Sequence, residues 1–163
     1  MSINVEKALT QMGFVADQNG YSLELPTRYK IAVVQNNNRF EVDYGPDIQI
    51  EHRSITNLSK PENIVVLECV HRLLRKGYSP KHIVLEKTWP LGHNESGRLD
   101  ILLKDLSGHA YALVECKTWG EEYGKERNKM LEDGGQLFSY FVQERQAKML
   151  YLYASKFDED RII

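Results

Sequence analysis

The sequence predicts an α/β fold in which helices flank a mixed β-sheet, preceded by a small β-rich unit. Three observations support this. Residues 1–58 alternate like short strands, a helix with clear start and stop signals begins near Ser59, and the remainder alternates between strand and helix patterns. A chain of 163 residues, 42% of them hydrophobic, is long enough to bury one sizeable core. We therefore expect one principal domain, residues 59–163, and an N-terminal appendage, residues 1–58.

The appendage combines a short helix with antiparallel strands. Asn4 is placed to cap a helix that ends before Gly13. The segments YSLELP, YKIAVVQ, FEVDY and DIQIEH then alternate like strands, and Asn36, Asn37 and Asn38 form the predicted hairpin turn. No motif in this unit points to a function.

The helix that opens the principal domain lies in SKPENIVVLECVHRLLRKG. Ser59 followed by Glu62 has the pattern of a capping box, and Gly77 is placed for the C-terminal cap. On a helical wheel the apolar side chains form one arc, whereas Glu68 and Arg72 lie largely opposite. We expect these two side chains to face solvent.

The rest of the domain alternates between strands and a helix. Residues 82–89, HIVLEKTW, read as a strand, and the loop PLGHNES leads to a hairpin, GRLDILLKDLSGHAYALVECKTWG. A charged, glycine-containing connection follows, then QLFSYFVQERQ as a helix and KMLYLYAS as the last strand. The predicted order is thus helix, three strands, helix and strand.

Carboxylates occupy hairpin positions where an ordinary core holds aliphatic residues. With Ser107 and Gly108 as a two-residue turn, Asp100 lies directly opposite Glu115. Strand alternation puts Lys117 on the same face. Two carboxylates placed in this way have Cβ atoms about 5 Å apart and repel unless a cation lies between them. The residues expected to enter the core from the opposite face are Leu99, Ile101, Leu103, Val114 and Cys116.

A divalent cation would offset this repulsion together with Lys117. Carboxylate oxygens suit Mg²⁺ or Mn²⁺, and no His or Cys cluster with zinc spacing accompanies them. The residues fit metal-assisted phosphodiester hydrolysis, with Asp100 and Glu115 as ligands and Lys117 orienting water or stabilising developing charge. The alternative is a charge cluster that only solvates an outer face of the sheet.

Four short segments carry a resemblance to a known family. They are KPENIVVLECVHRLLRKGYSPKHIVLEKTW, GRLDILL, LVECK and QLFSYF, in this order. Over residues 60–154 the sequence resembles the PD-(D/E)xK nuclease superfamily, and more narrowly the N-terminal nuclease domain of type I restriction enzyme R subunits and related restriction-modification proteins. The resemblance implies a restriction-endonuclease-like core. Asp100 and Glu115 match its metal-binding acids, and Lys117 matches its catalytic lysine.

The resemblance also implies roles for residues around this centre. The backbone carbonyl of Cys116 would be a further metal ligand, and Glu62 a helper acid in catalysis. Gln136 and Tyr140 match a Q-x-x-x-Y helix that supports the site or contacts DNA. As an alternative, a capping-box role explains Glu62 without catalysis. Leu99 stands where the superfamily often has proline.

DNA binding would depend on a local patch, because a formal net charge of −2 and a pI near 6.2 give no global basic field. The clearest basic run comprises Arg72, Arg75, Lys76, Lys81, Lys87 and Arg98. We take Arg72 and Arg98 as candidate contacts to the DNA backbone. Ordinary solvation of a helix explains the run about as well.

Cys69 and Cys116 are expected to be reduced core thiols, which fits the cytoplasm. The N-terminus lacks signal-peptide features, and no apolar run is long enough to span a membrane. We expect a Mg²⁺-dependent (or Mn²⁺-dependent) endonuclease domain of a restriction-modification system that cleaves double-stranded DNA. Helicase or methyltransferase modules would act with it, in the same chain or another, and a homodimer would cut both strands. The alternative is a non-cleaving DNA-binding or subunit-assembly module with the same fold.

Overall fold

The structure is a computed structural model that describes residues 3–37, 39–90, 96–158 and 161–163. In these residues it is an α/β fold with four α-helices and two β-sheets. The first sheet comprises β1 (Val15–Asp17), β2 (Gly20–Glu24), β3 (Lys30–Asn36) and β4 (Arg39–Asp43). The second comprises β5 (Gln49–Ile50), β6 (Ile83–Pro90), β7 (Ser96–Lys104), β8 (Ala110–Thr118) and β9 (Met149–Ser155). The predicted α/β class is confirmed.

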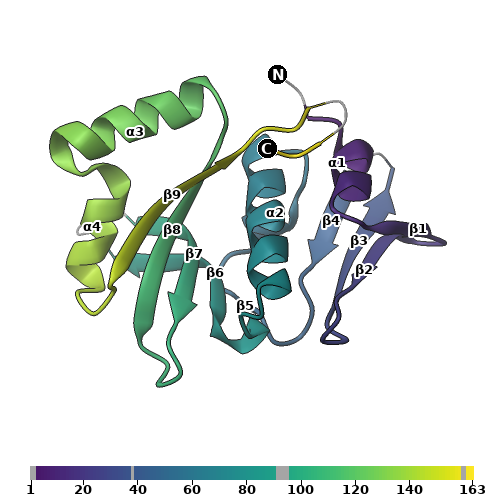
Figure 1. The fold of residues 1–163 in the computed structure, drawn as a ribbon, viewed down its shortest axis with the longest axis horizontal. Helices are drawn as coiled ribbons and strands as arrows, with labels where there is room; N and C mark the ends of the chain where they lie inside the picture. The colour runs from purple at the N-terminus through teal and green to yellow at the C-terminus, as the bar shows by residue number, and fades with distance from the viewer. Residues whose placement is uncertain (1–2, 38, 91–95, 159–160) are drawn as a thin grey trace.

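The second sheet is mixed, as predicted, and is covered on both faces. β5 runs parallel to β6 and β9 parallel to β8, whereas β6, β7 and β8 are mutually antiparallel. Apolar residues of α2 (Pro61–Arg75) share one core cluster with Ile101 and Cys116, and α4 (Gly135–Gln143) shares a second with Leu99 and Leu113. Figure 1 shows the order of layers, from α3 and α4 through this sheet to α2 and the first sheet.

The N-terminal unit contains the predicted helix and strands. Asn4 caps α1 (Val5–Gln11), accepting a hydrogen bond from the backbone N–H of Lys7 at 3.1 Å. The turn between β3 and β4 places Asn37 at a positive φ of 45°, and Asn38 lies outside the described residues. Residues 1–58 do not enclose a core of their own. Their buried side chains join those of α2 in one cluster, and β5 is a strand of the second sheet.

Helix α2 is buried on almost every side because it lies between the two sheets (Figure 1). The prediction that Glu68 faces solvent is therefore wrong. Glu68 is 2% exposed, and its carboxylate accepts hydrogen bonds from the Tyr153 hydroxyl and from Nε of Arg72. Arg72 is half-exposed at the same point, on the C-terminal half of the helix. The prediction from the helical wheel assumed that one face of the helix is exposed to solvent. Along most of its length α2 has no such face.

The start of α2 also differs from the prediction. The N-cap is Lys60, without a side-chain hydrogen bond, and Pro61 occupies the first turn, so Ser59 and Glu62 form no capping box. The helix begins one residue later than the capping box would require, so Glu62 is its second residue and not its third. At the other end, Gly77 follows the helix with a φ of 91°, as expected for the residue after a C-cap.

The hairpin of β7 and β8 pairs Ile101 with Val114, the predicted register. Its turn is longer than predicted, because the N–H of Asp105 donates to the carbonyl of His109 and a register shift follows at Leu103/Lys104. Leu99 was expected to face the same way as Ile101 but lies in the α4 cluster. The regular alternation of side chains is broken between Leu99 and Ile101, and Glu86, which lies across from Asp100 on β6, has a φ of 53°.

The connection between β8 and β9 contains two helices instead of the single one predicted. The charged segment forms α3 (Glu121–Asp133), in which only Glu126 is buried. A helix that is polar on all sides and interrupted by Gly124 carries no apolar stripe, so its sequence reads as a loop. Residues 91–95 of the predicted loop PLGHNES lie outside the described residues. None of the described helices is both long and apolar enough to cross a membrane.

Candidate active site

Asp100 of β7 lies close to Glu115 and Lys117 of β8 where the pairing of these two strands ends, in the middle of the second sheet. A carboxylate oxygen of Asp100, Oδ2, accepts a hydrogen bond from the backbone N–H of Cys116 at 2.7 Å. The ammonium group of Lys117 donates to Oε1 of Glu115, also at 2.7 Å. The three side chains predicted to form a centre are therefore brought together. Strand pairing positions them. Ile101 and Val114 form the last pair of β7 with β8, and Asp100 and Glu115 are their neighbours in sequence just beyond this pair.

Glu62 joins this group from the first turn of α2. Its Oε1 lies 3.4 Å from Nζ of Lys117, so the ammonium group bridges Glu62 and Glu115. The two carboxylates differ in environment: the side chain of Glu62 is 47% exposed and that of Glu115 only 4% exposed. The site is therefore open to solvent on the Glu62 side and closed around Glu115.

The electrostatics of the site are dominated by two buried acids that repel. Burial raises the pKa of Asp100 well above its usual range, and the neighbouring Glu115 raises it further. Burial also raises the pKa of Glu115, although Lys117 opposes this effect. Burial alone would lower the pKa of Lys117, but the carboxylate of Glu115 outweighs it and the pKa is raised. Lys117 is thus a firmly held cation, and one ammonium group faces three acids.

The second oxygen of Glu115, Oε2, is buried and has no hydrogen-bond partner among the described residues. A buried acceptor without a partner costs about 1–3 kcal/mol. An oxygen that is buried, anionic and next to a second carboxylate is a suitable ligand for a divalent cation. Among the described residues, no three His, Cys, Asp or Glu side chains are placed as a metal cluster. The ligand set implied by the resemblance contains only two such side chains, those of Asp100 and Glu115, with the carbonyl of Cys116.

Cys116 contributes through its backbone, as predicted for its side-chain direction. The thiol is fully buried in the core cluster of α2, and the other described cysteine, Cys69, is also buried and free. Burial raises the pKa of the Cys116 thiol, and its contact with Cys69 acts in the same direction. The thiol is therefore neutral and unreactive, and the amide of Cys116 is the part that faces Asp100.

Tyr140 is buried and contacts the backbone of β7. Its ring is 3% exposed and stacks on Trp89 at 5.4 Å, and its hydroxyl donates to the carbonyl of Arg98 at 2.7 Å. Burial raises its pKa to about 12. Tyr140 thereby fixes the backbone of β7 two residues before Asp100. The role of Tyr140 in DNA contact or site support stays a prediction.

Gln136 is exposed at the start of α4, and its backbone N–H donates to Oε1 of Glu126 at 3.3 Å. Nothing in the sequence singles out Glu126. It is 4% exposed, and its charge raises the pKa of Glu115, so it is a further buried acid near the site. In a segment rich in exposed acids, no signal in the sequence distinguishes the buried one.

The two candidate arginines lie in different places. Arg72 is ten residues beyond Glu62 on α2, about 15 Å along the helix axis, and it pairs with Glu68. It is remote from the acids. Arg98 is two residues before Asp100 on β7, and its Nη1 lies 2.9 Å from Oε2 of Glu86. Glu86 is itself buried.

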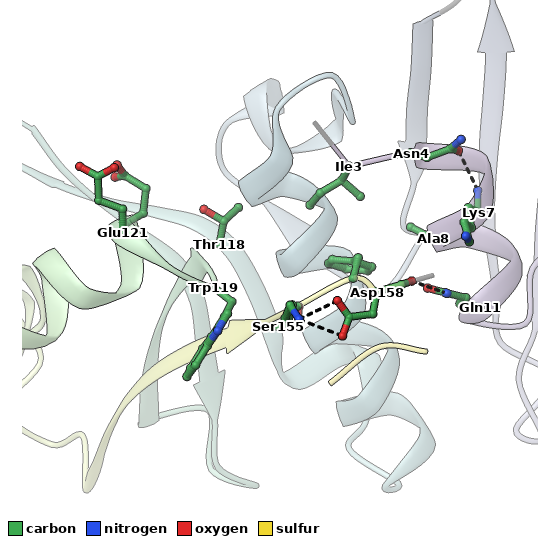
Figure 2. Close-up of a pocket in the computed structure, with 13 residues that line it drawn as sticks. Ile3, Asn4, Lys7, Ala8, Gln11, Thr118, Trp119, Glu121, Ser155 and Asp158 are labelled. Carbon is green, nitrogen blue, oxygen red and sulfur yellow. Dashed lines mark hydrogen bonds and ion pairs between the residues drawn. The ribbon is translucent and has the colours of Figure 1, made fainter. Parts of the chain in front are cut away.

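A cavity of about 550 Å³ lies between α1 and the ends of β8 and β9 (Figure 2). Thr118 and Ser155 line it from the two strands, Trp119 lines it just after β8, and Lys7 lines it from α1. Trp119 is 58% exposed and stacks on Tyr123 at 5.0 Å. Neither the acids nor Lys117 line this cavity, so it is a neighbour of the candidate site and not a part of it.

No model of a known protein family matches this sequence, and no similar sequence is found among curated proteins.

Proposed function

We propose that this chain is a Mg²⁺-dependent DNA endonuclease domain of a restriction-modification system, with a restriction-endonuclease-like core of the PD-(D/E)xK type. The observation that carries the proposal is the buried, unpartnered Oε2 of Glu115 beside Asp100. Two buried acids with raised pKa values and one bridging lysine form an arrangement that a divalent cation would stabilise. A structural charge cluster gains nothing from an unpartnered buried oxygen.

Asp100, Glu115 and the carbonyl of Cys116 would hold the cation. When bound, it would act as a Lewis acid toward a phosphate and lower the pKa of a coordinated water. The N–H of Cys116 fixes one oxygen of Asp100 and leaves the other available. Lys117 stays charged beside the acids, where it offsets negative charge that develops on the phosphate. Glu62 holds the ammonium group from the solvent side.

The substrate we propose is double-stranded DNA. With a net charge of −2 the chain attracts DNA weakly, which fits a nuclease domain delivered to its target by helicase or methyltransferase modules. One acid centre cuts one strand at a time, so cleavage of both strands would use two copies, as in a homodimer.

Metal binding tests the proposal first. We would titrate Mn²⁺ into the purified chain by calorimetry, beside Asp100→Asn and beside Asp47→Asn, a control at an exposed acid of the N-terminal unit. Saturable binding that is retained in the control and lost in Asp100→Asn is expected. Plasmid nicking that requires Mn²⁺ or Mg²⁺ and is lost in Lys117→Ala should follow. Absence of metal binding, with and without a DNA duplex, would overturn the catalytic proposal. Metal binding without nicking would indicate a non-cleaving module.

A further inference from the structure

A second polar cluster lies beside the acids and includes residues of the N-terminal unit. The 3₁₀ helix Arg53–Thr56 follows β5 and presents His52 and Ser54 toward β6 and β7. The ring nitrogen Nδ1 of His52 accepts a hydrogen bond from the backbone N–H of Ser54 at 3.2 Å. An Nδ1 that accepts is unprotonated, so the neutral ring carries its proton on Nε2. The imidazole is 55% exposed and offers this N–H to solvent.

Glu86 is the buried acceptor that holds Ser54 and Arg98 of the cluster. It is 7% exposed and has a φ of 53°, a backbone conformation that is unfavourable for a residue with a Cβ. Its Oε2 accepts hydrogen bonds from the Ser54 hydroxyl at 2.7 Å and from Nη1 of Arg98 at 2.9 Å. Unfavourable backbone conformations persist where the surroundings enforce them, and they concentrate at functional sites. Here the conformation turns a strand residue toward an arginine.

Arg98 is held by one edge and open at the other. Its Nη1 contacts Glu86, the Ser54 hydroxyl at 3.0 Å and Nδ1 of His52 at 3.3 Å. These three contacts all involve Nη1, and the side chain is 43% exposed. A guanidinium fixed in this way presents two parallel N–H donors, which is the geometry that binds a phosphate in a bidentate manner.

The cluster lies directly beside the candidate site. In the pairing of β6 with β7, Leu85 opposes Ile101 and Lys87 opposes Leu99, so Glu86 stands across from Asp100. Neighbouring strands lie about 4.8 Å apart. An anion bound by Arg98 is therefore within one or two nucleotide spacings of a phosphate at the acids. Glu86, the acid of this cluster, is buried, whereas the donors of Arg98 and His52 are exposed. The surface of the cluster is therefore cationic.

We propose that Arg98 and His52 bind a backbone phosphate of DNA adjacent to the one at the acids, with Glu86 as the positioning residue. This inference rests on the proposed function and gives the N-terminal unit a part in it. The contact is independent of sequence, because it involves only phosphate oxygens. It also accounts for a buried acid near a nucleic-acid surface, since the negative charge of Glu86 serves to orient a cation.

Binding without cleavage tests the inference. Fluorescence anisotropy of a labelled duplex in metal-free buffer gives the affinity at several salt concentrations. Arg98→Ala should weaken binding about tenfold and reduce the slope of log K against log salt by about 1, the effect of one lost phosphate contact. Arg98→Lys should restore the slope while recovering only part of the affinity. Arg39→Ala, the same charge change on the exposed N-terminal hairpin, is the matched control and should change little.

Substitutions of His52 and of Glu86 should change duplex affinity in different ways. His52→Gln should weaken binding a few-fold, because it removes a hydrogen-bond donor to the phosphate. Glu86→Gln removes a negative charge, so simple electrostatics predicts tighter binding, whereas loss of positioning predicts weaker binding. In cleavage, both variants should raise KM and leave kcat close to that of the wild type. Thermal unfolding of each variant shows whether the fold is retained, and Arg98→Lys provides the readout if Glu86→Gln does not fold.

The outcomes separate the inference from the proposed function. Failure of the wild type to bind duplex at any salt concentration would count against the function itself. Normal binding by the wild type with Arg98→Ala no different from Arg39→Ala would overturn the inference alone. Titration with inorganic phosphate identifies the source of the anion: binding of free phosphate that depends on Arg98, with duplex affinity unaffected, would assign the cluster to a small anion and refute a DNA contact.

Discussion

Removing the charge of Asp100 should stabilise the metal-free protein while abolishing metal binding. Asp100→Asn keeps the shape of the side chain and an oxygen that accepts from the N–H of Cys116. At about 5 Å and an effective dielectric constant of about 20, two like charges repel by about 3 kcal/mol. The attraction of Lys117 and a charge-assisted hydrogen bond offset part of this. We expect a net gain of about 1–2 kcal/mol, or about 2–8 °C in Tm for a chain of this size.

The gain should depend on pH in a defined direction. The folded-state pKa of Asp100 is raised above the ordinary value of 3.8, so the folded protein binds more protons than the unfolded chain. Stability of the wild type therefore falls as pH rises through the folded-state pKa, and the advantage of the variant appears over the same interval. Below about pH 4 the acid is protonated in both states, and wild type and variant should agree to within about 1 kcal/mol.

The assay is urea unfolding with EDTA between pH 4 and 8, with Asp47→Asn as the control for an exposed acid. Addition of Mn²⁺ should then stabilise the wild type and the control but not Asp100→Asn. The reasoning would be refuted if Asp100→Asn were less stable than the wild type at neutral pH without metal. That result would mean that the charge of Asp100 is fully compensated within the chain, and that no cation is needed.

Three further changes test individual contacts. Arg72→Ala leaves the buried carboxylate of Glu68 without its ion pair and should cost about 1–3 kcal/mol in urea unfolding, with duplex affinity unchanged. Tyr140→Phe removes the hydroxyl that binds the backbone of β7 and should lower the free energy of unfolding by about 1–2 kcal/mol, followed by tryptophan fluorescence. Glu62→Gln removes one of the carboxylates that raise the pKa of Lys117, so cleavage should be lost at a lower alkaline pH than in the wild type, as a pH–rate profile would show.

The strands and the centre of the candidate site could be predicted because they follow local rules. Strand side chains alternate with a period of two, so placing Asp100 opposite Glu115 required only the hairpin register. The register is correct near Ile101, although the turn that led to it is not. The prediction tolerated this error because the longer turn and the register shift compensate each other along the strands.

The parts that were missed depend on contacts between distant segments. Nothing in the sequence shows that α2 lies between two sheets, so the burial of Glu68 could not be inferred from its wheel position. Glu86 and Glu126 are isolated acids among many, and their burial is set by residues far away in the chain. The helix α3 has no apolar stripe, so the usual signal for a helix is absent. The sequence therefore predicted pairs within one hairpin and missed partners from different layers.

The position of α2 between the sheets has a consequence for how the protein can be divided. A fragment starting at Ser59 would expose the side of α2 that residues 1–58 cover, a continuous apolar surface on a fifteen-residue helix. It would also lose β5 and open the edge of β6 to pairing with other chains. The N-terminal unit thus covers an apolar face of the helix that carries Glu62. Residues 1–58 and 59–163 therefore depend on each other for burial, because their apolar side chains belong to one cluster.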